Sequence, residues 1–86
     1  MNTAAGYRLE LNAAGSWKLL SRFEGFTTED RAAVLHAGAL LVDALALAGS
    51  PGLKLRAATD EPYPRALTYY SYERGWHPKN PIEAME

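Results

Sequence analysis

The sequence predicts an α+β domain built from two β-hairpins and one long helix. Two segments before residue 24 and two after residue 52 alternate apolar with polar side chains, a period of two that is typical of half-buried strands. Between them lies a stretch of about 20 residues with helical spacing and with start and stop signals at its ends. The chain has 86 residues, the length of one domain. We therefore expect the element order ββαββ.

The first hairpin joins residues 7–12 to residues 16–23. Gly15 ends the connecting loop and suits the left-handed conformation that a three-residue loop needs at its last position. The resulting register pairs Leu11 with Trp17, Leu9 with Leu19 and Glu10 with Lys18. The two apolar pairs are therefore expected in the core, and Lys18 on the opposite side of the sheet.

The helix is expected to begin after Thr27, whose side chain forms a capping box with Asp30, and to end near Ala48. Gly49 suits the position that follows a helix end. An advance of about 100° per residue assigns to the sheet the residues Val34, Ala37, Gly38, Leu41, Leu45 and Ala48. The opposite face holds Ala32, His36, Ala39, Leu40, Asp43, Ala46 and Leu47.

The second hairpin comprises residues 53–59 and 65–73, joined by the loop 60–64. Two prolines stiffen this loop and display Tyr63. The helix returns along the sheet, so the strands before and after it, the second and the third, run in the same direction. With the spatial order 2-1-3-4, every neighbouring pair of strands is then antiparallel. We expect a four-stranded antiparallel sheet with the long helix on one face and the other face open. Residues 1–75 form the domain, and residues 76–86 are expected to be a coil tail.

The composition predicts a cytoplasmic chain without cofactor or metal. The chain has a net charge of −1, 48% hydrophobic residues and no cysteine, so it should fold by burial, without disulfides or thiolate metal sites. Residues 1–6 lack the positive and apolar regions of a signal peptide. The longest apolar stretch, residues 32–48, contains His36 and Asp43, and a carboxylate is costly inside a bilayer.

No arrangement of residues indicates catalysis. His36 and His77 do not have the spacing of a metal site, and the serines lack a nucleophile elbow. The acidic pairs at 29–30 and 60–61 are explained by a helix N-terminus and by a solvated turn. The glycines of residues 49–52 end a helix, whereas a phosphate-binding loop begins one. We therefore expect that the protein is not an enzyme.

The open face of the sheet gathers basic residues. Alternation places there Arg8, Glu10, Lys18, Leu20, Arg22, Lys54, Arg56 and either Tyr69 or Tyr70. Basic side chains interleaved with an aromatic ring are typical of a platform for single-stranded nucleic acid. A solvated face that Glu10 and Glu73 partly neutralise is the simpler explanation of the pattern, and the sequence has no RNP-like aromatic motif that would favour nucleic acid. Contact with an anion or a nucleic acid through Arg8, Lys18, Arg22, Lys54 and Arg56 is therefore the alternative function.

The outer face of the helix predicts self-association. Leu40 and Leu47 repeat at a spacing of seven residues on a face whose polar members are His36 and Asp43, so this face requires a cover. Small residues on the same face would let a second helix approach closely, namely Ala39 and Ala46. A twofold homodimer would cover the leucines. Folding of residues 76–82 over them is the competing explanation.

A protein partner is the preferred interpretation of the remaining exposed side chains. Aromatic residues dominate the binding energy of many interfaces, and two of them lie in segments expected to be loop or coil. The predicted partner-contacting residues are Tyr63, Trp76, Leu40, Leu47 and His36. We therefore expect a non-enzymatic protein–protein interaction module. Its size, near-neutral charge and lack of catalytic motifs would suit a phage or mobile-element inhibitor that blocks a larger machine.

Overall fold

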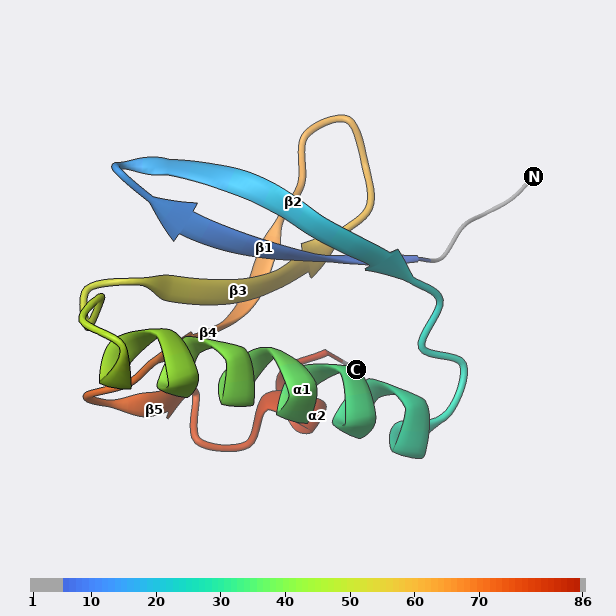
Figure 1. Ribbon diagram of the computed structural model, residues 1–86. Helices are drawn as coiled ribbons and strands as arrows, with labels where there is room; N and C mark the ends of the chain where they lie inside the picture. Colours follow the sequence, from blue (N-terminus) through green and yellow to red (C-terminus); the bar gives the residue numbers. More distant parts are fainter. Residues whose placement is uncertain (1–5, 86) are drawn as a thin grey trace.

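The computed structural model describes residues 6–85 as an antiparallel sheet of five strands with one long helix packed on one side (Figure 1). The elements in chain order are β1 (Tyr7–Ala13), β2 (Ser16–Phe23), α1 (Thr28–Leu47), β3 (Lys54–Thr59), β4 (Ala66–Ser71), β5 (Gly75–His77) and α2 (Pro81–Ala84). The order across the sheet is β2-β1-β3-β4-β5. The α+β class and the neighbours 2-1-3-4 are confirmed, and β5 adds a strand that was not predicted.

No helix in residues 6–85 combines the length and the apolar character that crossing a membrane requires. Residues 1–5, on which the expectation of no signal peptide partly depends, and residue 86 lie outside the described residues.

The register of the first hairpin differs from the predicted one by one residue. Ala14 and Gly15 both have positive φ angles, 58° and 86°, as in the two-residue type I′ turn that matches the twist of a hairpin. Trp17 is therefore paired with Asn12 instead of Leu11, and Trp17 and Leu19 lie on the side of the sheet away from α1. Lys18 pairs with Leu11 and lies on the helix side, so its predicted place on the open face is wrong.

The β1–β2 pairing has a bulge between Leu9 and Glu10, where the register shifts by one residue. Beyond the bulge, the residues of β2 again lie on the sides of the sheet that the sequence predicts. In this part of β2, Phe23 pairs with Tyr7, and these two rings pack against each other with centroids 5.5 Å apart. In Figure 1 α1 runs alongside β3, and the β1–β2 hairpin extends away from the helix; α1 contacts β3 and β4. Most residues of β2 are consequently exposed, including Leu19 and Leu20.

The helix begins and ends where the sequence predicts, but it is rotated about its axis. The Thr27 side chain accepts a hydrogen bond from the Asp30 amide at 3.0 Å, as a capping residue does, and Gly49 has the expected positive φ. The residues that α1 buries are Leu35, Gly38, Ala39 and Val42. Leu41, predicted to face the sheet, is 42% exposed.

The core lies between α1 and the strands β1, β3 and β4. Its buried apolar members are Leu9, Leu35, Val42, Leu55, Ala57 and Met85. Helix and sheet approach closely at Gly38, where a Cβ atom would lie 2.7 Å from a methyl carbon of Leu55. A larger residue at this position would separate the two layers.

The segment after residue 74, expected to be a coil tail, is part of the domain. It forms β5 and α2, and the Met85 side chain is buried in the core. The Tyr7 hydroxyl donates a hydrogen bond to the Met85 carbonyl at 3.1 Å. The Asn80 side chain caps α2 by accepting from the Glu83 amide, and Pro81 follows it. An Asn-Pro pair is a helix start signal, so the sequence did contain a sign of this turn.

Candidate functional site

One candidate surface is the outer side of α1. We define the outer helix surface as Ala33, Ala37, Leu40, Ala44 and Leu47, all of which are exposed. Their spacing of four, three, four and three residues is that of a heptad seam. Leu40 and Leu47 are 54% and 76% exposed. Ala39 and Ala46, expected on this surface, instead lie buried and half-buried, because the helix is rotated relative to the prediction.

Polar residues are nearly absent from this side of the helix. His36 is exposed beside the outer helix surface. Asp43 is half-buried and accepts a 2.7 Å hydrogen bond from the Tyr70 hydroxyl. Burial raises the pKa of Tyr70 to about 12, and the hydrogen bond to the Asp43 carboxylate contributes to this rise. The bond ties the second half of α1 to β4 and fixes which side of the helix faces solvent.

The Tyr70 pKa predicts a pH-dependent effect of Tyr70→Phe. Because the folded pKa lies above the ordinary value of 10.0, the stabilisation is present below pH 10 and is lost as the pH rises towards 12. We expect the substitution to lower the free energy of unfolding by about 1–2 kcal/mol at pH 8 and by much less near pH 12. Urea denaturation of both proteins at the two pH values measures the difference, and an equal loss at both would contradict the assignment.

A hollow adjoins the N-terminal end of the outer helix surface. It has a volume of about 320 Å³ and is lined by Phe23, Glu24, Gly25, Phe26, Asp30, Ala33 and Val34. Phe26 is 74% exposed. The Arg31 side chain donates a 2.6 Å hydrogen bond to the Gly25 carbonyl and so holds the entry loop against the helix. The apolar surface of α1 thus continues onto the loop before it.

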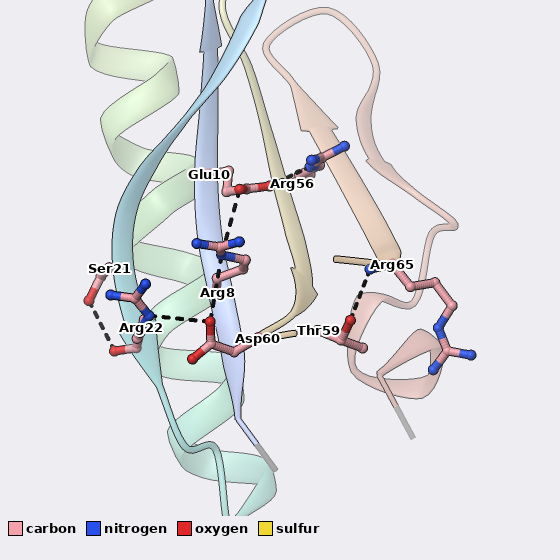
Figure 2. A network of polar contacts seen from close by, with 8 residues as sticks. All are labelled: Arg8, Glu10, Ser21, Arg22, Arg56, Thr59, Asp60 and Arg65. Atoms are coloured by element: carbon pink, nitrogen blue, oxygen red, sulfur yellow. Dashed lines mark hydrogen bonds and ion pairs between the residues drawn. The ribbon is translucent and has the colours of Figure 1, made fainter. Parts of the chain in front are cut away.

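The second candidate surface is the open face of the sheet. Its arginines form a network with two carboxylates (Figure 2). Arg56 Nε lies 2.6 Å from Glu10 Oε1, and Arg8 Nε lies 3.7 Å from both Glu10 Oε2 and Asp60 Oδ1. Arg22 Nε lies 3.2 Å from Asp60 Oδ1. Three of the residues predicted to contact an anion therefore have carboxylate partners within the protein.

Cross-strand pairing arranges the other half of this face in two rows. The first row runs across all five strands through Trp17, Asn12, Lys54, Ser71 and Gly75. The second row, one step nearer the arginine network, contains Leu19, Glu10, Arg56, Tyr69 and His77. The pairing thus shows that Tyr69, and not Tyr70, belongs to the open face.

Trp17 connects the two rows. The Arg56 guanidinium lies 4.3 Å from the centroid of its ring, a cation–π contact. The Tyr69 ring lies beside it, with centroids 6.1 Å apart and the planes inclined at 50°. These rings form part of a groove of about 420 Å³, the open-face groove, which is lined by Asn12, Trp17, Gly52, Lys54, Tyr69, Tyr70, Ser71, Arg74 and His77.

The predicted site residues do not form one cluster. Leu40, Leu47 and His36 lie together on α1, whereas Tyr63 is 91% exposed in the loop between β3 and β4. Trp76 lies in β5, half-buried, with its ring 5.0 Å from that of Tyr70, so it belongs to the edge of the core. It was expected to be free for a partner.

Sequence reasoning missed six of the nine lining residues of the open-face groove, namely Asn12, Trp17, Gly52, Ser71, Arg74 and His77. Trp17 was placed in the core by the wrong hairpin register. Asn12 lies beside it in the same row, and Arg74 and His77 belong to the segment around β5, which was not recognised as a strand. A two-residue turn at Ala14-Gly15 would have placed Trp17 correctly, but a non-glycine residue with positive φ is uncommon.

Among residues 6–85, no three histidine or acidic side chains converge as the ligands of a metal ion would. No protein-family model, curated protein or solved structure matches this chain.

Proposed function

We propose that the protein is a non-enzymatic interaction module that acts by protein contact and functions as a homodimer joined through the outer helix surface. The observation that carries this proposal is the exposure of five apolar residues in heptad spacing along α1. A helix face exposed to water normally carries charged side chains at every turn. From Ala32 to Ala48 the sequence offers only His36 and Asp43 as polar residues.

The competing explanation, a cover provided by the C-terminal segment, does not account for these leucines. That segment packs against β4 and contributes Ile82 and Met85 to the core region. Leu40 and Leu47 stay more than half exposed with the segment in place. A second copy of the chain is therefore the cover that we propose.

Side-chain sizes favour an antiparallel arrangement of the two helices. In a twofold dimer centred near Val42, Leu40 lies opposite Ala44 of the second copy, and Leu47 lies opposite Ala37. Each large side chain then meets a small one, which allows the helices to interdigitate closely. The same patch serves both copies, as a twofold interface requires. The outer helix surface carries no charge that would meet its own copy across the axis.

The size of the surface indicates a moderate affinity. The proposed interface consists of the exposed apolar side chains along one helix and of Phe26 at the adjoining hollow, and small interfaces of this kind are typical of weak or transient complexes. We therefore expect a dissociation constant on the order of micromolar.

Light scattering coupled to size-exclusion chromatography tests the proposal. At about 100 μM, well above a micromolar dissociation constant, the protein should have the mass of a dimer, and Leu40→Glu combined with Leu47→Glu should give a monomer. The control is Tyr63→Glu, which places a negative charge on a 91% exposed side chain in the loop between β3 and β4; this loop lies far from α1 in Figure 1, so the variant should stay dimeric. A monomeric protein at this concentration, or a dimer that survives the two leucine substitutions, would contradict the proposal.

A further inference from the structure

The open-face groove lies on the side of the sheet away from α1, so the proposed dimer leaves it accessible in both copies. Its volume of about 420 Å³ falls in the range of sites that hold small ligands or parts of larger ones. Three features of its lining define the chemistry of an occupant. They are aromatic rings, positive charges without ion-pair partners in the described part of the chain, and polar side chains.

The rings provide a surface for a planar group. Tyr69 is 43% exposed, and its ring is inclined at 50° to that of Trp17. Arg56 lies over the Trp17 ring and is itself held by Glu10 at 2.6 Å, so this part of the lining is rigid. A planar ring of the ligand can stack on Tyr69 with its edge towards Trp17. Stacking of this kind is tolerant of sequence, because every nucleobase has a π-face.

The positive charge available to a ligand is concentrated at this end of the face. Lys54 and Arg74 both line the groove, and neither forms an ion pair with any residue between 6 and 85. The arginines of the neighbouring network share two carboxylates instead. Among the residues that the structure describes, no carboxylate lines the groove. An anion in the groove is therefore attracted by Lys54 and Arg74 and does not contact an acidic side chain of that lining.

Polar groups lie in the same groove. Asn12 and Ser71 occupy the first row of the open face, and His77 lies in the second. The buried Nδ1 atom of His77 has no hydrogen-bond partner in the described part of the chain, although buried polar atoms normally have one. Amide, hydroxyl and imidazole groups of this kind hydrogen-bond the edges of nucleobases.

We propose that the open-face groove binds single-stranded nucleic acid, with a base stacked on Tyr69 beside Trp17 and phosphates held by Lys54 and Arg74. The first row crosses five strands, a distance of roughly 19 Å, which is longer than one nucleotide. A strand lying along this row avoids Glu10, which belongs to the second row and is bonded to Arg56. This site is separate from the helix surface of the proposed homodimer.

Fluorescence anisotropy of a labelled 12-nucleotide oligothymidylate at about 50 mM salt, where phosphate contacts are strong, tests this proposal. We expect Lys54→Glu combined with Arg74→Glu to weaken binding at least tenfold. The expected slope of log K against log salt is about −1.4 for two phosphate contacts on a single strand. Tyr69→Leu should weaken binding several-fold while keeping an apolar side chain.

The matched control is Lys18→Glu combined with Arg65→Glu, which makes the same charge change outside the groove. Lys18 lies on the helix side of the sheet, and the Arg65 side chain points away from the arginine network in Figure 2. This control should bind as the unchanged protein does. Thermal melting of each variant verifies that the fold is intact.

Three results would overturn the proposal. The first is the absence of binding, and the second is an equal loss in the control pair. The third is competition by thymidine monophosphate as effective as competition by the oligonucleotide, which would make the groove a mononucleotide site. The same titration with the Leu40→Glu, Leu47→Glu chain separates this proposal from the dimer, because a monomeric chain retains the groove and should still bind.

Discussion

Replacing Leu55 with alanine is expected to lower the free energy of unfolding by about 2–5 kcal/mol. Leu55 lies in the central strand β3 and has no exposed surface. Its methyl groups fill the space beneath Gly38, where α1 approaches the sheet closely. Neighbouring side chains cannot collapse into the vacated volume without moving the helix, so a cavity remains. Urea denaturation at low micromolar concentration measures the change.

Leu41→Ala is the matched comparison for this prediction. The sequence places Leu41 in the core, but the structure leaves it 42% exposed, so we expect a loss of about 1 kcal/mol or less. A loss at Leu41 as large as that at Leu55 would contradict the observed rotation of α1.

Glu10→Ala is expected to be the most damaging change on the open face, with a loss of about 2–4 kcal/mol. The Glu10 side chain is almost fully buried and faces Arg56 at 2.6 Å and Arg8 at 3.7 Å. Removing one partner of a buried pair leaves the other charge uncompensated. The two arginines keep some contact with solvent, 17–18% of their side-chain surface, which reduces the penalty.

Two further substitutions check the interpretation of this network. Glu10→Gln keeps the shape and one acceptor oxygen, so it should cost less than Glu10→Ala. Arg22→Ala removes an ion pair whose arginine side chain is 61% exposed, and its effect should stay below about 1 kcal/mol. If Arg22→Ala were as damaging as Glu10→Ala, burial would not be the reason for the importance of Glu10.

The elements with strong local signals were predictable from the sequence. The helix begins after the capping residue Thr27 and ends just before Gly49, as the sequence predicts. Alternation located the four longer strands. The three-residue strand β5 and the four-residue helix α2 are too short to produce a clear period, so they were assigned to coil.

The orientation of side chains was harder to predict than the elements. Alanine and leucine occur on all sides of α1, so periodicity does not distinguish the buried side from the exposed one. A turn shorter by one residue reverses the side of the sheet on which the neighbouring strand residues lie. For this reason Trp17, near the β1–β2 turn, lies on the open face and not in the expected core. The candidate surfaces depend on these orientations. Leu40, Leu47 and His36 share the outer side of α1 as predicted, and Arg8, Arg22, Lys54 and Arg56 share the open face as predicted, whereas Lys18 and Trp17 lie on the opposite sides from those expected.

Disulfide cross-linking tests the proposed antiparallel dimer most directly, because the chain contains no cysteine. The two single variants Ala37→Cys and Leu47→Cys are oxidised separately and as a mixture. The antiparallel arrangement brings residue 37 of one copy next to residue 47 of the other, within the short Cα separation that a disulfide requires. We predict that the mixture forms covalent dimers that contain one chain of each variant. Either variant alone should form few covalent dimers. Efficient cross-linking of each variant with itself, or none in the mixture, would contradict the account.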